Sequence, residues 1–136
     1  MRVLLDTNVL LDVLLRRDPW VAESSAVWQA NDEGRIVGHV MACAIADIFY
    51  IGRRLTELET AHRAVRICLE AFEVCAVDRL ALEQAQALPG NDFEDNLQIA
   101  CANLAGLDAI VTRDRQGFES AAMPVLLPEE LLKQLR

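Results

Sequence analysis

Short runs of apolar residues alternate with longer segments of helical periodicity along the whole chain. Five segments have the continuous apolar character of short strands that are buried on both faces. They are Met1–Asp6, Arg35–Val40, Phe72–Val77, Asp108–Thr112 and Pro124–Leu127.

Helices are predicted between these strands from periodicity and from their start and stop signals. Asp18-Pro19 is typical of an N-cap followed by proline at the first helical position, and Thr56-Glu57-Leu58-Glu59 has capping-box spacing. Asp78 provides a third N-cap. The predicted helices are Thr7–Leu15, Asp18 to Gly34, Ala42–Arg54, Thr56 to Ala71, Asp78 to Ala87, Asp92–Ala105 and one that starts at Pro128.

The alternation of strands and helices predicts an α/β fold. We expect a three-layer α/β/α arrangement with a parallel sheet of about five strands. A chain of 136 residues has the length of one domain, so we expect residues 1–136 to form a single unit. Ligands of such sheets bind beyond the carboxyl ends of the strands. The polar residues at those ends are therefore the candidates for function.

Composition excludes several classes of protein. Hydrophobic residues make up 53% of the chain, which excludes intrinsic disorder, and no apolar run approaches the roughly 20 residues of a membrane span. Asp6 and Asp12 interrupt the only candidate for a signal peptide, so we expect a cytoplasmic protein without a membrane partner. The formal net charge of −8 disfavours non-specific nucleic-acid binding through bulk charge.

The cysteines do not point to a metal site. Their sequence spacing contains no C-x-x-C pair, and their neighbours are apolar. We therefore expect four small buried thiols rather than zinc ligands or disulfides. These residues are Cys43, Cys68, Cys75 and Cys101.

Several carboxylates are predicted to converge at one edge of the sheet. Asp6 directly follows the first strand, and Asp114 lies two residues past another. Asp47 interrupts a strongly apolar helix, and Asp92 and Asp95 share a face in the first turn of theirs. Singly, Asp6 and Asp92 are also interpretable as helix N-caps, and Asp114 as an ordinary loop residue. Together they predict a cation site, and an all-oxygen donor set favours Mg²⁺ or Mn²⁺, with one or two ions.

Two other enzyme classes that place acids at strand ends are disfavoured. Haloacid-dehalogenase-type phosphatases need D-x-D after the first strand, but Asn8 stands where the second aspartate would be. Receiver domains need a lysine at the end of a late strand, whereas the only lysine is Lys133 in the terminal helix.

Four motifs in order resemble those of PIN-domain nucleases, the family that includes the VapC-type toxins of bacterial toxin–antitoxin pairs. The resemblance spans nearly the whole chain. The motifs read L-D-T-N-V-L-L-D from Leu5, A-D-I-F-Y from Ala46, D-F-E-D-N from Asp92 and T-R-D-R-Q-G-F from Thr112. Two positions depart from the family pattern: Asp47 replaces the usual glutamate, and Asn96 replaces alanine.

The resemblance implies a metal-dependent endoribonuclease that leaves 5′-phosphate and 3′-hydroxyl ends. The acidic cluster of the family falls on Asp6, Asp47, Asp95 and Asp114, with Asp92 as an auxiliary acid. It also implies a homodimer and, for a toxin, a cognate antitoxin as partner. Because Asp47 is one methylene shorter than glutamate, we expect its geometry to differ from the family's.

Further residues are assigned to supporting roles. We expect Asn8 and Thr112 to orient the carboxylates through hydrogen bonds. Arginines near the predicted site are candidate contacts for RNA phosphates, although at helix ends they are equally typical of solvated residues. They are Arg16, Arg17, Arg53, Arg54, Arg113 and Arg115. The alternative function is a non-catalytic PIN-like binding module with a vestigial metal site.

Overall fold

The structure is a computed structural model that describes residues 1–136. Its centre is a five-stranded sheet with the strand order β3-β2-β1-β4-β5, in which every neighbouring pair is parallel. The strands are β1 Arg2–Leu5, β2 Val37–Met41, β3 Glu73–Cys75, β4 Ala109–Val111 and β5 Val125–Leu126. This sheet confirms the predicted fold class.

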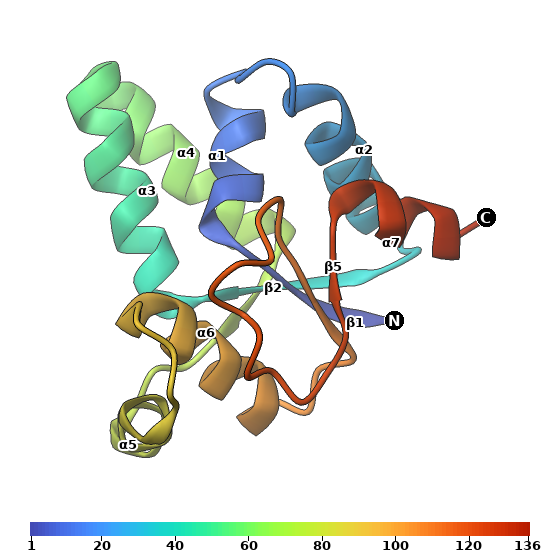
Figure 1. The fold of residues 1–136 in the computed structure, drawn as a ribbon. Coiled ribbons are helices and arrows are strands. Elements are labelled where there is room, and N and C mark those ends of the chain that lie inside the picture. The colour runs from blue at the N-terminus through green and yellow to red at the C-terminus, as the bar shows by residue number, and fades with distance from the viewer.

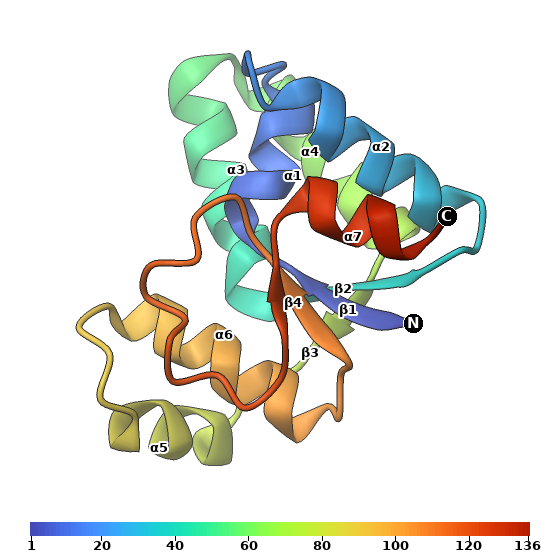
Figure 2. The same ribbon diagram turned by 45° about the vertical axis from the view of Figure 1, so that its right-hand side comes forward.

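Helices cover both faces of the sheet (Figures 1 and 2). Helices α5 and α6 lie on one face, and the other five helices lie on the opposite face. Their bounds are α1 Thr7–Leu14, α2 Val21–Asp32, α3 Ala42–Leu55, α4 Leu58–Ala71, α5 Arg79–Ala87, α6 Phe93–Leu104 and α7 Pro128–Gln134. None of these helices has the length and hydropathy of a membrane span.

The central strand β1 shows why the apolar runs are continuous. Val3 and Leu5 pack into the core beneath the five-helix layer, and Leu4 packs into the core shared with α5 and α6. All three side chains are buried. Because both faces of β1 are covered, no position between Val3 and Leu5 is left for a polar residue, and the first acid appears only where the strand ends.

The strand order brings two chain segments together at the carboxyl edge of the sheet. β1 lies between β2 and β4, and Leu5 is in register with Val111. The parallel pairing continues one step further, since the Asp6 amide donates to the Val111 carbonyl at 2.9 Å. The residues that follow β1 and β4 are therefore neighbours, as expected for a ligand site in an open parallel sheet.

Two predicted helix starts are wrong. Residues 18–20 form a turn, in which Trp20 lies against Arg113, and α2 begins only at Val21. Thr56 does not cap α4; its hydroxyl donates to the Gly52 carbonyl at 2.6 Å and so closes the last turn of α3. The cap of α4 is Glu57.

The prediction for the cysteines is wrong at one position. Three thiols are buried and unpaired, but Cys43 is exposed. Cys43 lies in the first turn of α3, where the neighbouring Ala44 instead faces the core.

Candidate functional site

Asp6 is held in place by hydrogen bonds to both of its carboxylate oxygens. It occupies the N-cap position of α1, yet its side chain makes no capping hydrogen bond. Instead the Gln98 amide nitrogen donates to Oδ1 at 3.0 Å, and the Thr112 hydroxyl donates to Oδ2 at 2.8 Å. Asp6 is only 6% exposed. Its carboxylate is thus fixed by α6 and by the end of β4 rather than used to start a helix.

A cavity of about 380 Å³ opens in front of Asp6, and we call it the acid cavity. Four further acids line it, from α3 and from the start of α6. Its walls are Asp6, Thr7, Asn8, Leu11, Asp47, Ile51, Asp92, Glu94, Asp95 and Gln98. The predicted acids Asp6, Asp47, Asp92 and Asp95 therefore surround one space.

Asp47 and Glu94 line the acid cavity as a pair of neighbouring carboxyl groups. A hydrogen bond to Asp47, then burial, then the charges of Asp47, Asp92 and Asp6 raise the pKa of Glu94 to about 7. The pair explains how an aspartate is accommodated within the apolar sequence of α3. Asp47 is half-buried at the wall of the cavity, and Glu94 of α6 extends to meet it.

The pKa of Asp95 is raised because the side chain is partly buried and is crowded by other acids. Burial, followed by the charges of Asp92, Asp6, Asp114 and Glu119, raises its pKa to about 6. Asp92, in contrast, is exposed and caps α6, since its Oδ1 accepts the Asp95 amide at 3.0 Å. The N-cap interpretation of Asp92 is therefore correct, although its side chain also lines the acid cavity.

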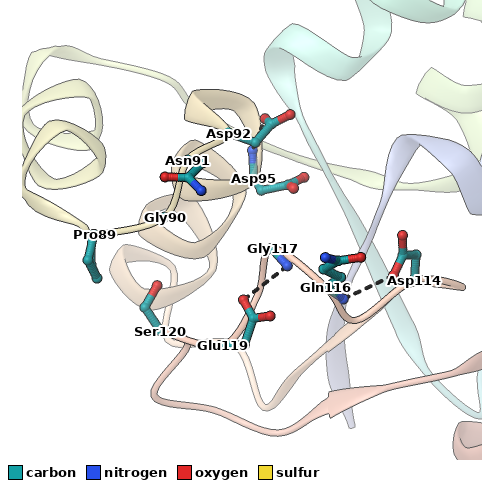
Figure 3. Close-up of a pocket in the computed structure, with 10 residues that line it drawn as sticks. All are labelled: Pro89, Gly90, Asn91, Asp92, Asp95, Asp114, Gln116, Gly117, Glu119 and Ser120. Carbon is teal, nitrogen blue, oxygen red and sulfur yellow. Dashed lines mark hydrogen bonds between the residues drawn. The ribbon is translucent and has the colours of Figure 1, made fainter.

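Asp114 lies across a second, adjoining space of about 480 Å³, the outer cavity. Figure 3 shows Asp92 and Asp95 on one side of it and Asp114 on the loop opposite. Asp92 and Asp95 line both cavities, so the two spaces share a wall. Asp114 Oδ1 accepts the Gln116 amide at 3.0 Å, which fixes the turn of this loop.

The donor set fits a small hard cation that keeps part of its water shell. No group of three or more Asp, Glu, His or Cys side chains is placed to hold one ion between them. An all-protein cage is thus absent, but Mg²⁺ commonly binds through one or two carboxylates plus waters. Two buried acceptors at the acid cavity, Thr7 Oγ1 and Gln98 Oε1, also have no hydrogen-bond partner within the protein. Bound waters of a hydrated ion would satisfy them.

The residues expected to support the acids lie close to them. Thr112 donates to Asp6, and Asn8 lines the acid cavity. Arg17 and Arg54 line a third cavity of about 600 Å³, the arginine cavity, which shares Asn8 with the acid cavity.

The other four predicted arginines are placed differently. Arg16 borders an apolar groove between α1 and α4, and Arg53 is exposed near the end of α3. Arg115 pairs with Glu130 at 2.8 Å. Arg113 pairs with the buried Asp12 at 2.9 Å.

The site also contains three residues that were not predicted from the sequence. Glu94 pairs with Asp47, Gln98 holds Asp6, and Glu119 lines the outer cavity. A signal existed for Gln98, because it lies three positions after Asp95 on the same helix face. No comparable signal marks Glu119, since its approach depends on the path of the loop after β4.

The close approach of Gly117 to Asp95 gives a testable prediction. Gly117 has a φ of +100°, and a Cβ there would overlap Asp95 Oδ2. We expect Gly117→Ala to lower the free energy of unfolding by about 1–3 kcal/mol and to displace the Asp95 carboxylate. Urea unfolding and the Mn²⁺-dependent rise in melting temperature would measure the two effects.

Gly34→Ala is the matched control for this substitution. Gly34 also has a positive φ, of +74°, but nothing lies within 4 Å of a Cβ at that position. It therefore reports the backbone cost alone. Equal losses of stability and equal Mn²⁺ responses in the two variants would contradict a role for the Gly117–Asp95 contact.

Solved structures with the same fold include a toxin and a toxin–antitoxin complex. The toxin VapC20 of Mycobacterium tuberculosis, which cleaves the sarcin–ricin loop, superposes with a TM-score of 0.71 at 16% identity, covering 89% of this chain and 95% of that one. VapBC of Salmonella typhimurium bound to DNA gives 0.70 at 15% identity, covering 94% and 98%. A toxin–antitoxin complex from Klebsiella pneumoniae gives 0.68 at 18% identity, covering 93% and 97%. At these identities the likeness shows the fold.

The comparison by sequence identifies the family. No curated protein matches the chain. The model of the PIN domain, however, matches residues 2–116, from the first strand through the loop that carries Asp114. The matched region includes all of the predicted acids. This chain therefore belongs to the PIN-domain family.

Proposed function

We propose that this protein is a Mg²⁺- or Mn²⁺-dependent endoribonuclease and the toxin of a toxin–antitoxin pair. The observation that carries the proposal is the convergence of Asp6, Asp47, Glu94 and Asp95 on one cavity at the carboxyl edge of the sheet. So many carboxylates in one half-buried space repel one another, and a divalent cation relieves that repulsion.

We rank the acids as cation ligands by how firmly each is held, and we assign the central position to Asp6. Its two hydrogen bonds fix it before any cation binds. Asp95 and Asp114 complete the set from the shared wall and the opposite loop, and Asp47 and Asp92 assist directly or through water. A bound cation would supply a water of lowered pKa and would neutralise charge on the scissile phosphate.

RNA would approach from the arginine cavity. Arg17 and Arg54 line this space next to the acids, so a backbone phosphate held there would bring the following phosphodiester toward Asp6. The net charge of −8 opposes a general electrostatic attraction to the RNA backbone. We therefore expect recognition of a particular structured RNA rather than a general affinity for nucleic acid.

The proposed partners are a cognate antitoxin and a second copy of the chain. The solved structures with this fold include a toxin–antitoxin complex from Klebsiella pneumoniae. For the homodimer, the segments Ala22–Trp28 of α2 and Ile45–Ile51 of α3 are the candidate surfaces. Within the second of these, Tyr50 is 65% exposed.

A cleavage assay with a cation titration tests the proposed function. The protein is incubated with a panel of structured RNAs, including ribosomal stem-loops, in Mg²⁺, Mn²⁺ or EDTA. We expect cutting that needs the cation and that falls by at least about 100-fold in Asp95→Asn. Asp32→Asn, an exposed acid at the end of α2, is the control and should cut at the wild-type rate.

A measurement without RNA separates a narrow target from a lack of catalysis. Mn²⁺ should raise the melting temperature of the wild type, because a ligand that binds only the folded state stabilises it. The rise should shrink in Asp95→Asn. No cutting together with no Mn²⁺ response would instead favour the non-catalytic PIN-like binding module.

A further inference from the structure

Asp12 is a fully buried acid that lies outside the acid cavity. It sits on α1 with 0% of its side chain exposed. Two arginines approach it: Arg113 Nε lies 2.9 Å from Oδ2, and Arg17 Nε lies 3.8 Å from Oδ1. The Ser24 hydroxyl of α2 donates to Oδ2 at 3.4 Å. A charge buried this completely cannot touch RNA or a cation in the cavities.

Arg113 is engaged on two sides of its guanidinium. Asp12 faces its Nε, and the ring of Trp20 lies against its Cζ, 3.9 Å from the ring centroid. Stacking on an aromatic face and pairing with a carboxylate are the two contacts that a guanidinium would otherwise offer to a nucleotide. Only 21% of the Arg113 side chain is exposed.

Arg113 also lies between Thr112, which contacts Asp6, and Asp114, which is itself one of the acids of the site. Thr112 donates to Asp6, and its hydroxyl oxygen accepts the Asp114 amide at 3.2 Å. Polar contacts to Asp6 thus hold this segment on one side, and the ion pair to Asp12 holds it on the other. A shift of Arg113 would move the backbone of Asp114 with it.

The ion pair contributes more to placement than to net stability. Burial raises the pKa of Asp12 despite the opposing charges of Arg113 and Arg17. Desolvation of the carboxylate therefore outweighs the attraction, as is common for buried ion pairs.

We propose that Arg113 is a positioning residue whose ion pair with Asp12, beneath the Trp20 ring, fixes the segment after β4 and thereby places Asp114 beside the other acids. This inference rests on the proposed function for its effect on cation binding, and it replaces the expectation that Arg113 contacts RNA. Its distinctive consequence is that substitutions of Asp12 on α1 and of Arg113 on the loop after β4 should have the same effect on cation binding.

The test compares Arg113→Gln and Asp12→Asn in three measurements. Each variant should raise the Mn²⁺ concentration at half-maximal thermal stabilisation by about tenfold. Each should speed amide hydrogen exchange over residues 114–118 in the absence of cation. In cleavage assays, the slope of log KM against log salt should stay at the wild-type value. Arg79→Gln on α5 is the control for loss of a positive charge, since Arg79 pairs only with Glu83 at the surface.

An RNA-contact role for Arg113 gives the opposite pattern. Arg113→Gln would then raise KM and reduce the salt slope by about one, with an unchanged Mn²⁺ midpoint and unchanged exchange, and this result overturns the proposal. If Arg113→Gln fails to fold, two other variants replace it: the double variant Asp12→Asn/Arg113→Gln, which leaves no charge unpaired, and the conservative Arg113→Lys. Arg113→Lys should retain part of the wild-type affinity for Mn²⁺. If the wild type neither binds Mn²⁺ nor cuts RNA, the proposed function fails. Hydrogen exchange over residues 114–118 still shows whether the Arg113–Asp12 ion pair fixes the segment after β4.

Discussion

Asp6→Asn should lower the rate of cation-dependent RNA cleavage by at least about 100-fold, while the protein stays folded. The substitution removes the charge from the carboxylate that is best fixed in the acid cavity. The fold should tolerate it because the asparagine oxygen can still accept from Gln98, while its amide donates to the Thr112 hydroxyl, which also accepts. Cleavage rates, melting temperature and circular dichroism would measure the three expectations.

The direction of the stability change separates this explanation from misfolding. The variant lacks the negative charge of Asp6, which repels Glu94 and Asp95 in the wild type. The cation-free variant should therefore melt at or above the wild-type temperature. Its response to Mn²⁺ should be lost at the same time. A variant that cuts RNA at the wild-type rate would refute the site, and one that melts well below the wild type would leave the charge argument without support.

The cation-free protein should be more stable at pH 5.5 than at pH 8. The pKa of Glu94 is raised from 4.5 to about 7 and that of Asp95 from 3.8 to about 6. In an unfolded chain both groups lose their protons near pH 4. Between about pH 4 and pH 7 the folded state therefore holds more protons than the unfolded state, and the free energy of unfolding falls as pH rises. We expect the melting temperature in EDTA to drop by about 5 °C.

Glu94→Gln should remove part of this pH dependence and raise the melting temperature at pH 8. Mn²⁺ should have a similar effect on the wild type, since it neutralises the same carboxylates and binds better once they are deprotonated. Glu59→Gln is the control, because Glu59 is exposed on α4 and remote from the acids. A melting temperature that rises from pH 5.5 to pH 8 in EDTA would contradict the assignment.

The sequence was sufficient to predict the sheet and the edge at which the acids gather. β1 is readable because its apolar run stops at Asp6, and parallel strands place such residues on one edge. The Asp47–Glu94 pair was not readable, since it depends on how α3 and α6 lie relative to each other. Periodicity indicates which face of a helix is apolar but not which helix it will meet.

Two local helix signals failed, and in each the residues make other contacts. Asp18-Pro19 has the chemistry of a helix start, yet α2 begins at Val21, after a turn in which Trp20 lies against Arg113. Thr56 has capping-box spacing, yet its hydroxyl bonds to Gly52 in the preceding helix. The ion pair of Arg113 with Asp12 was unreadable for a related reason: in a linear sequence, an arginine beside an acid cannot be assigned to a buried partner about 100 residues earlier.

The two hydrogen bonds on Asp6 also determine when the site can exist during synthesis. Gln98 and Thr112 lie 92 and 106 residues further along the chain than the carboxylate they hold. A growing polypeptide that ends before Thr112 carries Asp6 without the Thr112 hydrogen bond, and one that ends before Ala109 also lacks β4 to pair with β1. Contacts this distant in sequence form late in folding. If the proposed cation site needs both hydrogen bonds on Asp6, a nascent chain would acquire that site only after Thr112 has been synthesised.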